Sequence, residues 1–427
     1  MKLIIPIEYY RHGGVERVIV SLIKEISQQI EQTIVILPPN KVAYFQELLP
    51  KSEAIIYEPL HWPSNSYGNK LNSFYNKLLI LFRKLKLRPL EAAITKKIKR
   101  LRSTARIEHL VKQYQATHCL YCLTNRLTPP NLEIPLGMIS HDVFWHFAPL
   151  TYPDAYVEEY DRSLITWLEK VDIVFSVSEK TRKDILSFLP DFAQKIKTVP
   201  NSGFIVGQKE QKSLPHKTEF QEIVSFYFPS SFGIYKDQLT LLQAGIKLAK
   251  KGLDFKIIFT GKETDNLVKG NLSLSQQSQT QEYIDYLQKC QQIYQENPQL
   301  MEDYFVGLGY CDEEVVEECY QNCSCVVVPS KYEGFGLAVS EAIVRGMPVI
   351  CSDLAVFHEQ VELYKCSDLI EFFPLGDVDA LATSLEKFIL SPKPKLSTTK
   401  IAERFNHWTW KEVAQEYVRL FQLSSQS

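Results

Sequence analysis

The sequence predicts an α/β protein built from two doubly wound parallel-sheet domains that face a central cleft. The chain of 427 residues is longer than a usual single domain. Short apolar runs alternate with longer amphipathic stretches in both halves, as strands and helices do in parallel sheets. A polar stretch with little apolar periodicity, residues 201–220, separates the halves. We therefore expect a first domain over residues 1–205, a second over 206–400, and a terminal segment over 401–427.

The expected strands follow one another in the same rhythm in each half. In the first half, short apolar runs that end at turn or polar residues predict strands over residues 3–7, 33–37, 54–57, 118–122, 136–140 and 173–177. In the second half, similar runs predict strands over residues 225–229, 255–260, 304–306, 324–329 and 348–352. Such Rossmann-like sheets bind ligands outside the carboxyl ends of their strands, so the ligand is expected between the two domains.

Composition narrows the class of protein. A formal net charge of −2, with 45% hydrophobic and 23% charged residues, is typical of a soluble globular protein and names no nucleic-acid partner. The nine cysteines lie mostly in apolar runs, which indicates reduced core thiols in the cytosol. The apolar start of the chain is too short for a signal peptide or membrane span. We therefore expect a cytoplasmic protein.

One segment departs from this neutral average. Between Lys70 and Arg106 twelve basic residues face a single acid, Glu91, and apolar residues are interleaved with them. A helix with one apolar and one basic face could contact an anionic membrane surface, such as the inner face of the plasma membrane. The alternative is a solvated helix whose long basic side chains cover apolar surface. The sequence leaves both open.

The strongest motif is the run VVVPSKYEGFGLAVSEAIVRGMPVICSD, residues 326–353. A buried strand ends at Pro329, a glycine-bearing loop follows, and a helix is expected to begin near Gly336 or Leu337. The unpaired amides at such a helix start can bind phosphate. Glu333 and Glu341, eight positions apart, carry acceptor-only carboxylates that suit the hydroxyls of a ribose or hexose. The pattern favours a sugar nucleotide, although two solvated glutamates would show the same spacing.

This run resembles the donor-binding E-x(7)-E segment of family-4 glycosyltransferases, retaining enzymes of the GT-B fold. The resemblance implies that Glu333 contacts the hydroxyls of the donor sugar and that Glu341 holds the ribose. It also implies that the amides around Phe335, Gly336 and Leu337 meet the sugar and the phosphate.

Further segments resemble the same family in the expected order. Gly13 and Gly14, in RHGGVERVIVSLIKEI, resemble its phosphate-facing glycine loop, with a helix starting near Val15. His141, in ISHDVFWHF, resembles its active-site histidine near the sugar and the acceptor. Lys236, just before an amphipathic helix, could neutralise the diphosphate as it leaves.

Three other matches concern structure more than chemistry. Ser178, in residues 174–185, is expected to cap a helix. Asn201, in VPNSG, would approach the acceptor side where the first domain closes. Residues 405–421 resemble the terminal segment and helix that cross back over the first domain in this fold.

The chain departs from the family at one point. The family commonly has an arginine several residues before the lysine, whereas this chain has Ser230, Ser231 and Phe232 there. The second cationic contact to the diphosphate is therefore missing from that loop.

Two short motifs receive structural interpretations. Asp377 and Asp379 have the D-x-D spacing of some metal-dependent transferases, but they precede a helical run and are expected to cap it. Cys119 and Cys122 lie within an apolar run without a second pair at zinc spacing, so we expect core thiols. We predict no metal site and no cofactor.

The resulting prediction is a metal-independent retaining glycosyltransferase. It would move a hexosyl unit of mannose or glucose type from a UDP- or GDP-sugar to a hydroxyl of a carbohydrate or lipid-linked acceptor, in polysaccharide or glycolipid assembly. Two alternatives stay open: a nucleotide-sugar epimerase or phosphorylase on the same fold, and a non-catalytic partner subunit that binds nucleotide. The predicted catalytic residues are His141, Lys236 and Glu333, and the predicted donor-binding residues are Gly13, Gly14, Phe335, Gly336, Leu337 and Glu341.

Overall fold

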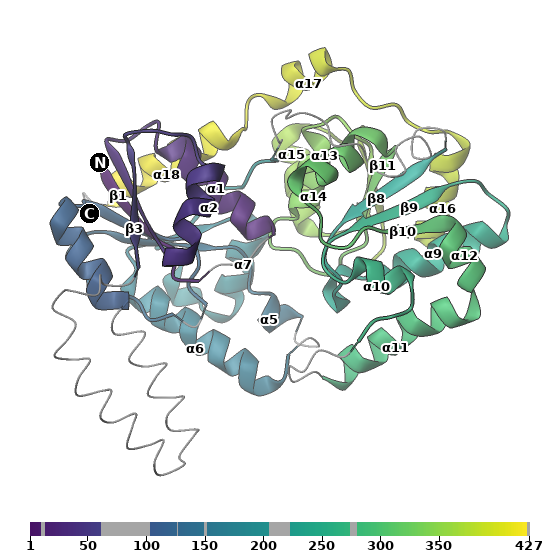
Figure 1. Ribbon diagram of the computed structural model, residues 1–427, viewed down its shortest axis with the longest axis horizontal. Helices are drawn as coiled ribbons and strands as arrows, with labels where there is room; N and C mark the ends of the chain where they lie inside the picture. The colour runs from purple at the N-terminus through teal and green to yellow at the C-terminus, as the bar shows by residue number, and fades with distance from the viewer. Residues whose placement is uncertain are drawn as a thin grey trace, which may run out of the picture.

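Two α/β domains lie side by side in the computed structural model (Figure 1). The structure describes residues 1–9, 13–60, 103–125, 127–148, 152–204, 223–273 and 280–424. Each domain holds one sheet in which all paired strands are parallel. The predicted fold class, two Rossmann-like parallel-sheet domains, is confirmed.

The first domain is built on a seven-stranded sheet in the order β3-β2-β1-β4-β5-β6-β7. Its strands are β1 (Lys2–Pro6), β2 (Gln32–Leu37), β3 (Ile55–Pro59), β4 (His118–Tyr121), β5 (Leu136–Ser140), β6 (Ile173–Ser176) and β7 (Ile196–Thr198). Two separate apolar clusters cover its faces, because side chains alternate between the faces of a strand: Leu3 and Ile5 join one cluster, and Ile4 joins the other.

Helices flank this sheet on both faces. They include α1 (Gly14–Ile26), α2 (Val42–Leu48), α5 (Phe144–Phe147), α6 (Asp154–Lys170) and α7 (Glu179–Phe188), with 3-10 turns at Pro39–Lys41 and Pro190–Phe192. Ser178 caps α7 as predicted, since its hydroxyl accepts the Thr181 N–H at 2.9 Å. Gly13 and Gly14 lie at the start of α1. The helix begins at Gly14, one residue before the predicted start at Val15.

The second domain is built on a six-stranded sheet in the order β10-β9-β8-β11-β12-β13. Its strands are β8 (Ser225–Pro229), β9 (Lys256–Thr260), β10 (Phe305–Gly307), β11 (Cys325–Val328), β12 (Val349–Ser352) and β13 (Ile370–Phe373). Its helices are α9 (Gln238–Lys250), α10 (Thr264–Val268), α11 (Gln281–Glu296), α12 (Pro298–Tyr304), α13 (Glu313–Asn322), α14 (Leu337–Ile343), α15 (Ala355–Tyr364) and α16 (Val378–Leu390), with a 3-10 turn at Ile234–Lys236. One large apolar cluster fills this domain.

Two strands, β7 and β13, were not predicted from the sequence. Both are edge strands, at the outer end of their sheets. β7 is only three residues long and contains exposed Lys197, and β13 has two half-buried residues. Short, partly polar edge strands lack the continuous apolar run that marks the buried strands.

The chain finishes on the first domain. After α17 (Thr398–Phe405), α18 (Trp410–Ser424) packs against α1, and Figure 1 shows its yellow ribbon among the purple elements. Val413, Ala414, Tyr417 and Phe421 of α18 are completely or almost completely buried in the first domain's core. The rings of Tyr417 and Phe175 stack at 4.2 Å.

Some predictions fall outside the described residues. The basic segment from Lys70 to Arg106 is described only from residue 103 onward, and there Arg106 is buried and bonded to Glu58 at 2.8 Å. The expected domain boundary at 205/206 also lies outside the described ranges. Across those ranges, no helix is both long and apolar enough to cross a membrane.

Candidate functional site

A cleft of about 690 Å³ lies between the two domains. It is lined by the loops that follow β1 and β5 in the first domain and β8, β9 and β11 in the second. The order of each sheet reverses direction beside β1 and β8, and parallel sheets bind ligands at such switch points. The fold therefore brings the carboxyl ends of both sheets to one ligand-sized space.

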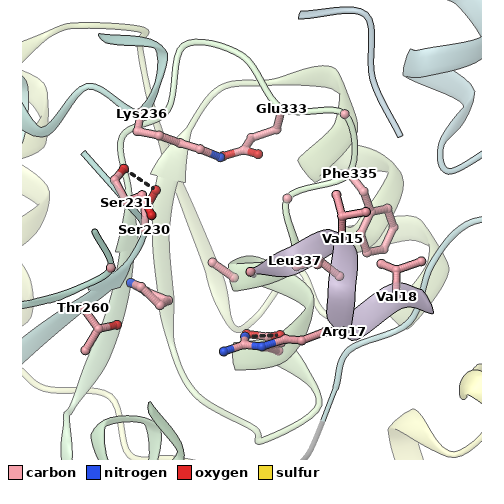
Figure 2. A pocket seen from close by; sticks show the side chains of 18 of the residues that line it. Val15, Arg17, Val18, Ser230, Ser231, Lys236, Thr260, Glu333, Phe335 and Leu337 are labelled. Carbon is pink, nitrogen blue, oxygen red and sulfur yellow. Dashed lines mark hydrogen bonds and ion pairs between the residues drawn. The ribbon is translucent and has the colours of Figure 1, made fainter. Parts of the chain in front are cut away.

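All nine predicted site residues line this cleft. From the first domain come Gly13, Gly14 and His141, and from the second come Lys236, Glu333, Phe335, Gly336, Leu337 and Glu341. Figure 2 shows α1 approaching the loop that carries Phe335 and Leu337. The approach is close, because a Cβ atom at Gly14 would lie 3.0 Å from Leu337 Cδ1. The fold therefore brings all nine residues into one cleft, and the roles assigned to them stay predictions.

Lys236 and Glu333 meet across the second domain's half of the cleft. Lys236 Nζ donates to Glu333 Oε1 at 2.7 Å (Figure 2). The Ser330 hydroxyl donates to the same oxygen at 2.7 Å. Burial by itself would lower the pKa of Lys236, but the Glu333 carboxylate more than offsets this and the pKa is raised. The amine is therefore a fixed positive charge at the cleft wall.

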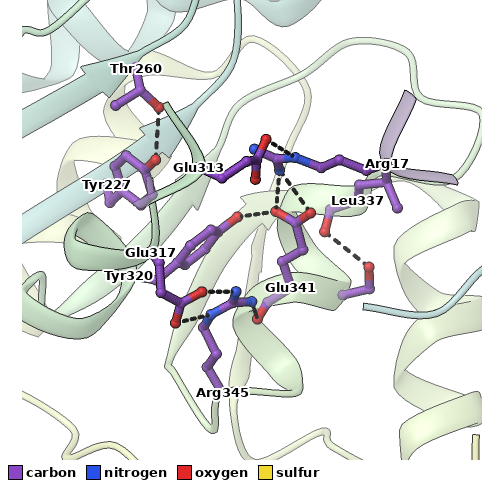
Figure 3. Close-up of polar contacts among 10 residues, drawn as sticks. Arg17, Tyr227, Thr260, Glu313, Glu317, Tyr320, Leu337, Glu341 and Arg345 are labelled. Carbon is purple, nitrogen blue, oxygen red and sulfur yellow. Dashed lines mark hydrogen bonds and ion pairs between the residues drawn. The ribbon is translucent and has the colours of Figure 1, made fainter. Parts of the chain in front are cut away.

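Glu341 is the most enclosed charge of the cleft, with 2% of its surface exposed. Its carboxylate accepts the Tyr320 hydroxyl at 2.7 Å, and Arg17 Nη1 lies 3.0 and 3.2 Å from its two oxygens (Figure 3). Arg345 Nη1 donates to the Glu341 carbonyl at 2.8 Å, and Arg345 also pairs with Glu317. Such a network holds a buried carboxylate in one orientation.

The imidazole of His141 donates a hydrogen bond to the backbone of its own domain. Its Nε2 lies 2.8 Å from the Cys122 carbonyl oxygen, which can only accept, so Nε2 holds the hydrogen. Burial lowers the pKa of His141 to about 4, although the Cys122 hydrogen bond works in the opposite direction. At neutral pH the ring is therefore uncharged and Nδ1 is an acceptor, suited to a sugar hydroxyl.

Asp142, the residue after His141, is the only carboxylate that the described part of the first domain contributes to the cleft lining. Burial raises the pKa of Asp142 to about 6, and the charges of Glu333 and Asp184 add to the effect, while the Phe144 N–H and Lys236 oppose it. The sequence analysis did not single it out. Its carboxylate is ionised at neutral pH at a cost in stability.

We expect Asp142→Asn to stabilise the protein at neutral pH. Between pH 4 and 6 the folded state binds more protons at this position than the unfolded state, so this acid lowers stability as the pH rises. The cleft admits some solvent, which reduces the effect, and we expect a gain of about 1–2 kcal/mol above pH 7 and none near pH 4. Denaturant unfolding of both proteins across this range measures the difference. An equal gain at pH 4 and pH 7 would contradict it.

Gly334 joins the two domains at the centre of the cleft. A Cβ atom there would lie 2.0 Å from the His141 carbonyl oxygen, so no larger residue fits without moving this loop. The Gly334 carbonyl accepts the hydroxyls of Ser178 at 2.5 Å and Thr181 at 3.0 Å. The helix cap predicted at Ser178 thus also binds the loop that carries Glu333.

Gly336 needs the conformational freedom of glycine. Its φ of 78° lies in the left-handed region, and a Cβ atom there would lie 2.3 Å from the Phe357 ring. Gln360 fixes the loop from behind, because its amide donates to the carbonyl oxygens of Phe335 at 2.5 Å and Gly336 at 3.2 Å. The backbone of the expected phosphate-binding loop is therefore rigid.

The two short motifs, at Asp377 and at Cys119 and Cys122, have structural roles. Asp377 caps α16 as expected, since its carboxylate accepts the N–H groups of Asp379 at 3.0 Å and Ala380 at 2.9 Å. Cys119 and Cys122 are buried free thiols, as predicted. In the described ranges no group of three or more His, Cys, Asp and Glu side chains could hold a metal ion.

Two further residues from the sequence analysis line the cleft. Ser230 and Ser231 occupy the loop where the family commonly has an arginine. Asn201 also lines it, and its buried side-chain oxygen has no hydrogen-bond partner among the residues that the structure describes. These positions give the cleft polar groups but no second cation in that loop.

The architecture is that of the GT-B fold, in which two Rossmann-like domains face each other across a cleft. The second domain can be assigned more closely, because residues 208–405 match the family model described as "Glycosyl transferases group 1". Over these residues the second domain is similar to that family.

Individual relatives are distant. The chain is 23% identical over 294 residues to the serotype-specific mannosyltransferase WbdA of Escherichia coli, which covers 65% of this chain but only 32% of that relative. Sucrose-phosphate synthase from Thermosynechococcus elongatus superposes with a TM-score of 0.66 at 16% identity over all of both chains. HepE from Anabaena, solved with UDP and glucose, superposes with a TM-score of 0.60 at 14% identity over 99% of both. These structures establish the shared fold.

Proposed function

We propose that this protein transfers a hexosyl unit from a nucleoside-diphosphate sugar to a hydroxyl acceptor, with retention of configuration and without a metal. The observation that carries the proposal is the meeting of Lys236, Glu333, Glu341 and His141 in one interdomain cleft. The similarity of the second domain to group 1 glycosyl transferases supports the same class of reaction.

Each group has a chemical role in this proposal. Glu341 holds the ribose and Glu333 contacts the donor sugar, as the resemblance to family-4 enzymes implies. Lys236 stabilises the negative charge that develops on the departing diphosphate, where a fixed cation lowers the barrier. The amides around Gly336 and Leu337 contribute to the same phosphate site.

The sugar and the acceptor are proposed from the relatives. Mannose or glucose is favoured because WbdA is named a mannosyltransferase and HepE was solved with UDP and glucose. The acceptor would be a carbohydrate or a lipid-linked carbohydrate, bound on the first domain beside His141 and Asp142. Contact with the inner face of a membrane through the basic segment that begins at Lys70 belongs to the same proposal, without Arg106, which is buried and bonded to Glu58.

The test is release of nucleoside diphosphate from a panel of UDP-, GDP- and ADP-sugars by the purified full chain, with a chelator present. We expect release from one donor, and we expect Glu341→Ala to abolish it, because a carboxylate at the base of the site would be lost. Glu362→Ala, an acid on α15 that does not line the cleft, serves as the matched control.

The outcome also separates the alternatives. An epimerase would convert the sugar without releasing diphosphate, and a phosphorylase would require free phosphate. If no donor is turned over and no nucleotide raises the thermal unfolding midpoint, the non-catalytic partner becomes the better explanation, and the transferase proposal fails.

A further inference from the structure

Arg17 is a cation of the cleft to which the sequence analysis gave no role. It lies in the first turn of α1 and crosses from the first domain to the second. Its Nε donates to Glu313 Oε1 at 2.9 Å, and its Nη1 contacts both oxygens of Glu341 (Figure 3). A first-domain guanidinium is thus held against the carboxylate to which we assign the ribose.

Two atoms of the Arg17–Glu341 pair can still form hydrogen bonds with a ligand: Glu341 Oε1 as an acceptor and Arg17 Nη2 as a donor. Glu341 Oε2 already receives both Arg17 and Tyr320, whereas Oε1 receives only Arg17 among the described residues. Arg17 Nη2 makes no hydrogen bond to any residue within the described ranges. The pair lines the cleft and therefore keeps a carboxylate oxygen with remaining acceptor capacity beside an N–H group without a partner among the described residues.

This combination is complementary to a vicinal diol. Each ribose hydroxyl can donate one hydrogen bond and accept others. One hydroxyl can donate to Glu341 Oε1 while its neighbour accepts from Arg17 Nη2. A carboxylate alone could only accept, so the guanidinium doubles the kinds of contact that the site makes with the sugar.

The neighbouring carboxylates stabilise the positive charge of Arg17. Burial would lower the pKa of Arg17, but Glu341 and Glu313 more than offset this and raise it. The side chains of Arg17 and Glu341 are 18% and 2% exposed, and hydrogen bonds to ionised groups in such a dry site are about twice as strong as neutral ones. A structural tie between the domains would use only the pairing of Arg17 with Glu341 and Glu313, whereas a ligand contact would also use the N–H groups of Arg17 Nη2.

We propose that Arg17 binds the ribose of the donor together with Glu341, so that the nucleotide site is completed by the first domain. This rests on the proposed function, which supplies the ribose. The donor site predicted from the sequence drew its side chains from the second domain alone, and the first domain contributed only the backbone of Gly13 and Gly14.

The test compares ribonucleotides with analogues that lack the diol. Binding of UDP, GDP and ADP and of their 2′,3′-dideoxy counterparts to the full chain is measured by calorimetry for the wild type, Arg17→Met and Arg17→Lys. Arg404→Met is the control, because Arg404 pairs with Asp368 and does not line the cleft. Thermal unfolding checks that each variant is folded.

We expect Arg17→Met to weaken binding of the cognate ribonucleotide about tenfold or more, the size of a lost charge-assisted hydrogen bond. The dideoxy nucleotide should bind the wild type and Arg17→Met within about threefold of each other, because the partner of Arg17 is already absent. Arg17→Lys keeps the charge but not the fork, so its loss should be intermediate. If Arg17→Met does not fold, Arg17→Lys gives the deciding comparison.

Several results would overturn the inference. Equal weakening of both nucleotides would make Arg17 a structural tie, and unchanged or tighter ribonucleotide binding would exclude a ribose contact. If the wild type binds no nucleotide at all, the proposed function fails together with this inference. If it binds nucleotide without dependence on Arg17, only this inference fails.

Discussion

Lys236→Met should reduce the rate of sugar transfer by about 100- to 1,000-fold, the usual effect of removing a preorganised charge from a developing anion. Donor affinity should change far less, because the amine acts mainly on the charge that appears in the transition state. Methionine matches the aliphatic part of the lysine side chain without its amine, and Glu333 keeps its hydrogen bond from Ser330. The measurement is kcat and KM for the active donor.

The matched control is Lys251→Met, an exposed lysine that pairs with Glu386 on the surface of the second domain. It should leave both constants within about twofold of wild type, as surface pairs contribute little. Lys236→Arg, which retains the charge in a different shape, should recover part of the rate. A kcat for Lys236→Met within about threefold of wild type would remove Lys236 from the mechanism.

Phe421→Ala should destabilise the first domain by about 3–5 kcal/mol, the usual loss for a fully buried phenylalanine. Its ring is completely buried, lies 5.1 Å from that of Phe175, and fills the space that the absent side chain of Gly137 leaves free. Hydrogen exchange should accelerate in β1, β5 and β6 while β11 and β12 keep their protection.

Leu423→Ala provides the control for the same helix, because Leu423 is 50% exposed on α18. It should change stability by less than about 0.5 kcal/mol. If Phe421→Ala left exchange in the first domain unaltered, α18 would be a peripheral addition and not part of that domain's core.

Local pattern was enough to predict all strands of both sheets except the edge strands β7 and β13, and to place most of the cleft. Lys236 and Glu333 each follow a buried strand that the sequence marks clearly, and parallel topology brings those strand ends together. Ser178 predicted a helix cap through the chemistry of its hydroxyl, and the glycine-bearing loop predicted the start of the next helix near Gly336 or Leu337.

The missed residues depend on contacts that no local pattern encodes. Arg17 looks like one more polar position on an amphipathic helix, and only the docking of the two domains places it on Glu341 and Glu313. Asp142 resembles any polar residue after a strand until burial and the neighbouring Glu333 raise its pKa. Tyr320 lies 21 positions before the carboxylate that it orients, on a different helix.

The return of α18 to the first domain has a consequence for biosynthesis. Residues 410–424 leave the ribosome only after the whole second domain has been made. The face of the first sheet that α1 and α18 cover together therefore lacks α18 during most of translation. The second domain, whose main cluster ends at Phe405 apart from the flanking Trp408, can fold before that helix appears. The domain made first would then be the last to reach its native state, and the nascent chain would expose apolar strand surface that chaperones recognise.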